Sequence, residues 1–438
     1  MLMEGQVVAA TRFGLGVTPG MIHEMGRDPR GWVAQQIATN DGISSYHIPS
    51  LQERLNILFP KKGDGDAKVI SRKREAFINR ARDSRIARGI STSTPFAERL
   101  SRYWFDHFNI SVSKLMILGL ADWYEADAIR PHVLGRFRDM LGATARHPAM
   151  IWYLDNLTSV GPRSEVGRRR NAGLNENYAR ELLELHTLGV NGGYTQRDVR
   201  EVAKILSGWR AETRPGEAAV RVFFDPAYHE PGDKKIMGKV IKENGAKELD
   251  DLLDYLASSP ATAAHVAWRF SRHFIADSPP DDLVKALKDR FLRTDGDLRE
   301  LALGLIEFED AWKAPAQKAL PPEDWGIAFA RLISLTGDDA PARIRNAATA
   351  MGQMGYAAPS PKGWPDELSA WLTPETIIAR SSWARRLSED KDDLPDPRSI
   401  LKAYGDFIGE AERMIIFGAP SSQDGLALIA AMPQFNLR

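Results

Sequence analysis

The chain has 438 residues, and its 58 Lys and Arg balance 58 Asp and Glu, so its formal net charge at neutral pH is zero. Zero net charge argues against a protein built mainly to bind nucleic acid. Hydrophobic residues make up 43% and charged residues 26%, which is ordinary globular usage and argues against disorder. The absence of cysteine excludes disulfides, thiolate metal sites and cysteine nucleophiles. A catalytic site must therefore use His, carboxylates, hydroxyls, Lys or Arg.

The start of the chain does not resemble a secretory signal. Residues 1–10 contain Glu4 and no basic leader, and Arg12 follows where the apolar core of a signal should run. We expect a cytoplasmic protein as written, or a periplasmic or exported one if a leader was removed. The longest nearly apolar run, 425–432, is far shorter than the roughly 20 residues of a spanning helix. We therefore expect no membrane span.

Apolar residues recur at helical spacing along most of the chain, for example in 96–104. Alternating strand patterns are scarce, and Val220–Phe224 is the one credible strand. We expect it to pair with 235–241 after a loop rich in Pro and Gly. The sequence thus predicts a mainly α protein, a single large multi-helix domain over 1–438 with αα-hairpins and a small β-hairpin excursion near 220–241.

Charge and composition mark four segments within this domain. We expect a basic charged loop and helix at 60–90, as a solvated face, and a mobile basic loop at 160–174. Acidic residues and two prolines mark a linker at 385–400 before the C-terminal helices. The segment 175–209 is the most informative, because its signals predict a central αα-hairpin.

This hairpin has start and stop signals at both helices. Asn175 is a good N-cap and Gly189 suits a left-handed terminating position, which predicts a first helix of about fourteen residues. A turn containing two glycines follows. Thr195 and Asp198 then form a capping-box start for a second helix that ends near Trp209.

On a helical wheel of the first helix, His186 falls inside the apolar arc and Glu181 at its edge. An ionised carboxylate in that position is costly to bury unless a cation, a metal or several donors meet it. The alternative is that Glu181 pairs with an arginine, such as Arg130 or Arg136, while His186 is a satisfied core histidine.

Glu181 and His186 lie about 140° apart on this helix, so a metal would need a ligand from elsewhere. His107 is a candidate for this additional metal ligand, because it lies on the same inward helix face as Phe96. With Trp104 one turn before it, the helix end would present a polar pocket floored by aromatic rings. The alternative for His107 is packing or capping at the helix end.

Three groups of candidate residues result. The predicted catalytic residues are Glu181, Glu184, Arg180, Asn177 and His186. The predicted ligands of a divalent metal are His107, Glu181 and His186. The predicted substrate-binding residues are Trp104, Arg130, His132, Asn175, Tyr194 and His229. In this hypothesis Glu181 or Glu184 acts as a base or metal ligand, and Arg180 holds an anionic group.

Five strings of the sequence resemble the bacterial family called domain of unknown function 1800. They are WFDHF at 104–108, IRPH at 129–132, HPAM at 147–150, GLNENYARELLELHTLG at 173–189 and GGYTQ at 192–196. The resemblance runs nearly the whole chain, and the long central string is highly specific. It implies no established activity. It does imply a functional link to a neighbouring sulfatase- or phosphatase-like protein, because genes of the two families often lie together, and it implies export for many members.

Two hypotheses of function follow. The first is a hydrolytic or metal-assisted enzyme that acts on a carbohydrate or another polar polymer. The second is a noncatalytic helical scaffold or binding protein in which the same polar residues form a buried network. A pocket that holds His107, Glu181 and His186 within ligand reach of each other would favour the enzyme. Full pairing of Glu181 with an arginine would favour the scaffold.

Overall fold

The structure is a computed structural model, and it describes residues 2–38, 48–61, 63–213, 220–313, 315–389, 391, 393–404 and 408–438. The described chain is mainly helical, as the sequence predicts, with two antiparallel two-stranded sheets. None of the described helices combines the length and the apolar character that a bilayer-spanning helix needs.

The elements follow in chain order. The N-terminal helices are α1 (Leu2–Val8), the π-helix η1 (Ala9–Phe13), α2 (Met21–Met25), α3 (Pro29–Gln35), α4 (Leu51–Leu58) and α5 (Ala67–Ser91). The next helices are α6 (Pro95–His107), α7 (Leu115–Leu118), α8 (Ala121–Tyr124), the π-helix η3 (Glu125–Ile129), the 3-10 helix η4 (Arg130–His132), α9 (Phe137–Arg146), α10 (Pro148–Tyr153), the 3-10 helix η5 (Asn156–Thr158) and α11 (Glu165–Arg170).

The second half begins with the predicted hairpin. Its elements are α12 (Asn177–Glu181), the π-helix η6 (Leu182–His186), α13 (Gln196–Leu206), β1 (Trp209–Thr213), β2 (Val220–Phe224), β3 (Lys234–Ile236) and β4 (Lys239–Ile241). They are followed by α14 (Lys247–Ala257), α15 (Pro260–Phe274), α16 (Asp281–Arg293), α17 (Leu298–Glu307), α18 (Asp310–Lys313), α19 (Pro322–Leu332) and α20 (Ala340–Ala350). The C-terminal helices are α21 (Leu368–Trp371), α22 (Pro374–Ser388), α23 (Pro397–Tyr404), α24 (Glu410–Phe417), α25 (Ser422–Ala431) and α26 (Pro433–Asn436).

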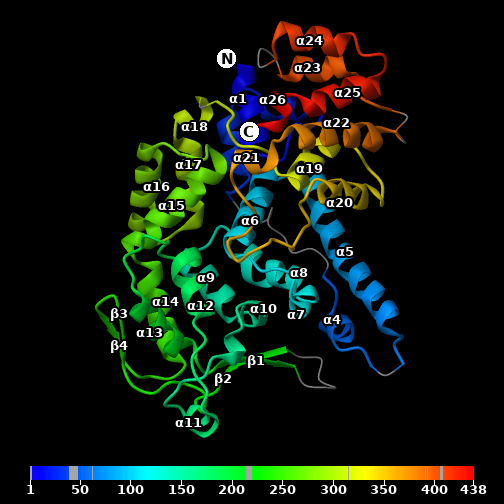
Figure 1. Cartoon of the computed structure of the whole chain (residues 1–438). Coiled ribbons are helices and arrows are strands. Elements are labelled where there is room, and N and C mark those ends of the chain that lie inside the picture. The colour runs from blue at the N-terminus through cyan, green and yellow to red at the C-terminus, as the bar shows by residue number, and fades with distance from the viewer. Residues whose placement is uncertain are drawn as a thin grey trace.

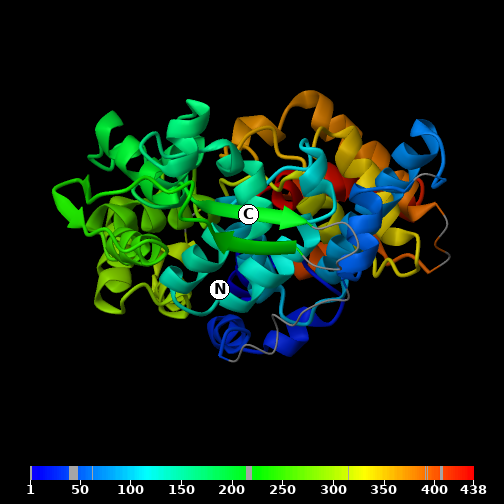
Figure 2. The same ribbon diagram turned by 90° about the horizontal axis from the view of Figure 1, so that it is seen from below.

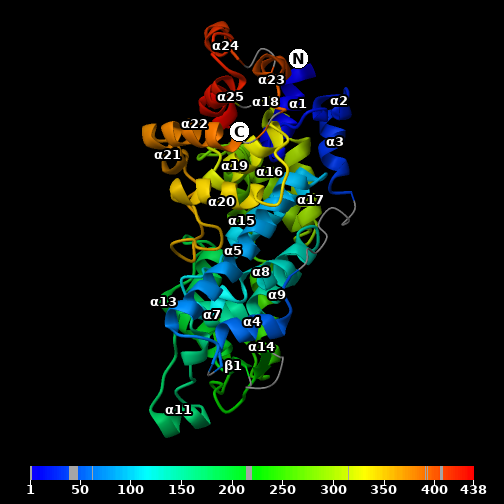
Figure 3. The same cartoon turned by 90° about the vertical axis from the view of Figure 1, so that its right-hand side faces the viewer.

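The helices surround α6. Figure 1 shows α14–α17 on one side of α6 and α4 and α5 on the other, while the first and last helices gather at one end of the molecule. Seen from the side, α24 lies at that end and α11 at the opposite one (Figure 3). The sheet β1–β2 runs across the end near α11, as the view from below shows (Figure 2). The two chain ends are neighbours, since α1 packs against α23.

Helix α6 is central because almost all of its residues are buried. Pro95 occupies its first turn, where the missing N–H costs nothing. Buried apolar side chains from Val7 to Phe435 form one cluster around it. The described residues thus share one core, which places segments from both halves of the sequence beside α6.

The predicted hairpin forms, although its first helix differs from the expectation. Only Asn177–Glu181 is α-helical, and the next five residues form the π-helix η6. Gly189 has a φ of 81°, the left-handed conformation that the sequence predicts. The second helix begins with the expected capping box of Thr195 and Asp198, but it ends at Leu206 because the chain turns into β1.

Other local predictions need correction. Val220–Phe224 pairs with Trp209–Thr213, whereas the expected partner segment folds on itself as the β3–β4 hairpin. The three arginines of the expected mobile loop lie in α11, which Ser164 caps by accepting the N–H of Gly167. The expected linker is short, since α22 and α23 occupy its two ends. Lys62 in the basic segment and Asp390 and Asp392 in the linker lie outside the described residues.

Candidate functional site

The polar side of the hairpin is held together by Arg180. Its guanidinium lies 3.6 Å from the carboxylate of Glu176 and 3.7 Å from that of Glu184. It also donates to the side chain of Gln196 on α13 at 2.8 Å. Burial and a hydrogen bond to Glu184 raise the pKa of Tyr194, so its neutral hydroxyl donates to that carboxylate. Glu184 is therefore oriented from two sides.

Glu181 lies apart from these contacts. It is half-buried, and it forms no hydrogen bond or ion pair with any described residue. Burial and the neighbouring Glu184 raise its pKa, and Arg180 only partly opposes them. Arg130 and Arg136 both pair with other carboxylates. The expected pairing of Glu181 with one of these arginines is therefore wrong.

Asn177 and Asn175 have structural partners. The amide of Asn177 donates to the carbonyl oxygen of Leu154 at 3.3 Å. The amide of Asn175 donates to the hydroxyl of Thr158 at 2.8 Å, while its side-chain oxygen accepts the N–H of Asn177 at 2.9 Å. Both asparagines thus fasten the start of α12 to the preceding turn.

Three histidines meet where η6 ends. His107 on α6 makes a hydrogen bond of 3.1 Å from Nε2 to the carbonyl oxygen of His186. His265 on α15 makes one of 3.2 Å from Nε2 to the carbonyl oxygen of Leu185. The rings of His107 and His265 are 6.2 Å apart. Because a carbonyl oxygen only accepts, both Nε2 atoms carry the proton.

All three imidazoles are held neutral. Burial, Arg269 and His265 lower the pKa of His186 to about 3. Burial and Arg269 lower the pKa of His265 to about 4, and they bring that of His107 well below its usual range. The Nδ1 atom of His107 and the Nε2 atom of His186 are buried without a hydrogen-bond partner among the described residues.

The predicted metal set is not assembled. Across the described ranges, no group of three or more His, Asp or Glu side chains is placed to hold a metal ion. His107 and His186 approach each other, but through the ring of one and the carbonyl oxygen of the other. Glu181 does not complete a ligand set with them.

A cavity of about 640 Å³ lies on the outer side of this histidine cluster, between 184–192 and α15. Glu184 and His265 line it, together with Trp268, Arg269 and Trp364. Trp268 is 40% exposed, and the guanidinium of Arg272 lies 5.1 Å from the centre of its ring. A cavity with exposed indole rings and a few charged groups is typical of a small-molecule or polymer site. We call it the α15 cavity.

None of the six predicted substrate-binding residues lines the α15 cavity, including Tyr194, which contacts Glu184 from outside the lining. Trp104 is 0% exposed within the core. Arg130 is buried and pairs with Glu98 and Glu125. His132 is half-buried in η4, away from the cavity lining, and Asn175 has the structural contacts given above. These side chains are excluded from the cavity because core packing or local caps use them.

His229 does not line the α15 cavity either, because it is buried elsewhere. Its Nδ1 donates to the carbonyl oxygen of Ser207 at 2.7 Å, and its Nε2 lies 3.0 Å from the ammonium of Lys234 and 3.1 Å from the carboxylate of Glu248. Lys234 also pairs with Glu248 at 2.6 Å, and both side chains are fully buried. The loop that carries His229 is thus fixed to α14 by a buried ion pair.

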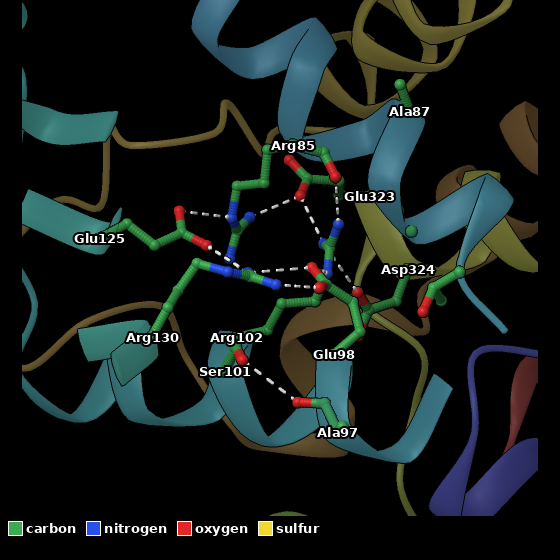
Figure 4. A network of polar contacts seen from close by, with 12 residues as sticks. Arg85, Ala87, Ala97, Glu98, Ser101, Arg102, Glu125, Arg130, Glu323 and Asp324 are labelled. Atoms are coloured by element: carbon green, nitrogen blue, oxygen red, sulfur yellow. Dashed lines mark hydrogen bonds and ion pairs between the residues drawn. The ribbon is translucent and has the colours of Figure 1, made fainter. Parts of the chain in front are cut away.

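A buried network of ion pairs joins α6 to its neighbours (Figure 4). Arg130 donates to Glu98 at 2.5 Å, and Arg102 lies 2.7 Å from Glu323 on α19. Arg85 on α5 joins Glu323 at 2.6 Å to Glu125 at 3.3 Å. The network links four segments that are far apart in the chain, and its charges are largely compensated.

The cavity residues of α15 have a recognisable pattern in the sequence. His265, Trp268, Arg269 and Arg272 recur at helical spacing, so they share one face of the helix. An aromatic and basic stripe of this kind is a signal for a binding surface. Asp106 is a second residue that the sequence analysis did not identify. Its side chain accepts the N–H of Trp364 at 2.9 Å, which holds the loop around Trp364 against α6. Burial raises the pKa of Asp106 to about 6.

Comparison with known proteins gives one finding. A family model described as "Protein of unknown function (DUF1800)" matches residues 8–437. No curated protein and no solved structure matches the chain.

Proposed function

Since the chain belongs to the DUF1800 family, whose description carries no activity, we propose a function from the α15 cavity. The proposal is a hydrolytic enzyme that acts on a carbohydrate or another polar polymer. One observation carries it: Glu184, an oriented carboxylate from the family motif, lines the same cavity as Trp268 and Trp364. Indole rings offer flat apolar faces for sugar rings, and carboxylates supply acid–base chemistry for hydrolysis.

Glu184 is the proposed general base. Its partners Arg180 and Tyr194 hold the carboxylate in place, so it is available to take a proton from a water that attacks the bound substrate. Glu181, three residues earlier, has a raised pKa but does not line the α15 cavity, so we assign it no role in proton transfer. The proposed role of Glu184 needs no ligand set from the three histidines.

The alternative is a noncatalytic binding protein, and the ion-pair network of Figure 4 favours it. Five buried charged side chains are engaged in that network, as expected when polar groups fix how helices pack; they are Glu98, Arg102, Glu125, Arg130 and Glu323. A binding protein would use the α15 cavity without turning its ligand over. Affinity and turnover therefore need separate measurements.

The test compares Glu184→Gln with Glu176→Gln in the full chain. Both carboxylates pair with Arg180, but only Glu184 lines the cavity, so Glu176→Gln is the matched control. Release of reducing ends is measured on a panel of polysaccharides. We expect Glu184→Gln to lower the rate by about 100-fold or more while binding persists, since a general base contributes on that order. The control should change the rate by less than about threefold.

Two outcomes would contradict the enzyme. Equal rates for Glu184→Gln and the wild type would remove Glu184 from the chemistry. Tight binding without any release of reducing ends would favour the binding protein. Thermal unfolding of both variants separates loss of chemistry from loss of fold.

A further inference from the structure

The carboxylates of the α15 cavity are already neutralised by neighbours. Glu184 pairs with Arg180 at 3.7 Å, and Glu367 pairs with Arg272 at 2.9 Å. Asp366 pairs with the buried ammonium of Lys318 at 3.3 Å. Every carboxylate that lines the cavity therefore has a cation within 4 Å, although Arg180 is shared with Glu176 and Lys318 with Asp277.

Two cations of the cavity remain without such a partner. Arg269 and Lys362 both line it, and neither forms an ion pair or a hydrogen bond with any described residue. Arg269 affects the pKa of Asp106, but the two form no ion pair. The lining therefore contains two cations, Arg269 and Lys362, that no carboxylate of the described residues pairs with.

Arg269 is half-buried beside the histidine cluster, and it lowers the pKa of His107, His186 and His265. The ring nitrogens that carry protons on His107 and His265 point at carbonyl oxygens and cannot accept from Arg269. None of the side-chain nitrogens of Arg269 is both buried and without a hydrogen-bond partner, so water reaches the guanidinium. An anionic group that displaces this water would supply the acceptors that a guanidinium binds best.

We propose that the α15 cavity takes an anionic saccharide, whose carboxylate or sulfate group binds Arg269 and Lys362 while its ring stacks on Trp268. This inference rests on the proposed function, because it names the substrate class of the same site. Guanidinium binds carboxylate and sulfate oxygens through two parallel N–H donors, which gives both affinity and orientation. Lys362 adds a flexible second charge at the cavity rim.

The experiment measures the affinity of the full chain for paired oligosaccharides that differ only in charge. One pair is tetragalacturonate and its methyl ester, and the other is sulfated and unsulfated maltotetraose. The two pairs distinguish a carboxylate from a sulfate. We expect at least one anionic member to bind about tenfold or more tightly than its neutral counterpart, since hydrogen bonds to charged groups are worth that much.

Arg269→Gln should remove this preference and leave the affinity for the neutral member unchanged. Arg272→Gln, one turn away on the same helix, should also weaken the preference, because it leaves the carboxylate of Glu367 in the cavity without its cation. Arg269→Lys should keep part of the preference, because the lysine retains the positive charge. This result would show that the loss in Arg269→Gln does not come from misfolding of the protein. Arg72→Gln on the exposed face of α5 controls for unspecific attraction of anions.

The outcomes separate the two proposals. Neutral and anionic members that bind and are cleaved equally well would overturn the inference and leave the hydrolytic function standing. Preferred binding of an anionic member without cleavage would support the inference and overturn the hydrolysis. Equal loss of binding in Arg269→Gln and Arg72→Gln would also overturn the inference, because the attraction would then be unspecific. Failure of all four oligosaccharides to bind would overturn both.

Discussion

His107 and His265 show what single side chains contribute at the end of a π-helix. The last carbonyl groups of a helix have no intrahelical donor. Leu185 and His186 supply two of these carbonyls, and the imidazoles of His265 and His107 donate to them from two other helices. Burial keeps both imidazoles neutral, and in each of them the proton is on Nε2, the atom that donates. Their main role in the fold is therefore to close η6.

At this scale we expect His107→Ala to destabilise the protein by about 2–4 kcal/mol, because it leaves a buried carbonyl unpaired and a void beside Trp104. His107→Gln retains an N–H donor and should recover part of the loss. The free energy of unfolding in urea measures both. His23→Ala, at an exposed position in α2, is the control and should stay within about 0.5 kcal/mol. If His107→Ala were equally harmless, the closing role would be refuted.

Among the elements, the turn between η6 and α13 sets the shape of the α15 cavity. Gly189 lies in this turn and lines the cavity. A Cβ at Gly189 would lie 2.7 Å from Nδ1 of His265, in addition to the cost of its left-handed backbone. Gly193 has a similar φ of 83°, but a Cβ there would meet nothing closer than 4.0 Å. The two glycines differ in contact rather than in conformation.

This difference gives a prediction for a matched pair. Gly193→Ala should cost about 1 kcal/mol from backbone strain alone. Gly189→Ala should cost about 1–2 kcal/mol more, because His265 must shift and release the carbonyl of Leu185. Urea denaturation measures the difference between the two variants. Equal losses of unfolding free energy in the two variants would mean that His265 shifts at no cost. The position of His265 in the cavity wall would then not be fixed by its packing.

The whole molecule depends on one core and on histidines that are neutral inside it. Besides the half-buried His132, whose pKa is also lowered, five described histidines have a lowered pKa because they are buried, with values of about 3 or 4 where they are defined. They are His107, His147, His186, His265 and His273. In the unfolded chain each returns to a pKa of about 6.5. Below that pH the unfolded chain binds protons that the folded chain does not, so acid favours unfolding.

We expect the free energy of unfolding to fall by at least about 5 kcal/mol between pH 7 and pH 5, since each histidine contributes up to about 1.4 kcal/mol per pH unit. Asp106 acts in the opposite direction. Its folded pKa of about 6 lies above its unfolded value, so the folded chain gains a proton there as the pH falls, and this offsets part of the loss. Urea unfolding at pH 7, 6 and 5 checks the slope. A stability that is flat over this range would contradict neutral burial of the five rings.

Local signals account for the elements that the sequence predicts well. Helical periodicity, the capping box of Thr195 and the left-handed Gly189 depend on neighbours within one turn, and the structure confirms all three. The Glu176–Arg180–Glu184 ladder is likewise local. The same reasoning failed for the partner of Val220–Phe224, because pairing between strands depends on where the chain turns.

The sequence by itself determined a mainly helical chain with a family motif on an αα-hairpin, and it pointed to Glu184 and Arg180. The sequence does not show which polar side chains lack an ion pair or hydrogen bond, because the partner of each charge comes from the segment that packs against it. Arg130 pairs with Glu98, and His229 contacts Lys234. His107 donates a hydrogen bond to a carbonyl oxygen that lies 79 residues away in the sequence. Only the tertiary structure brings α15 beside the hairpin and leaves Arg269 unpaired there. Burial and long-range pairing, which no local pattern encodes, thus decided the candidate site.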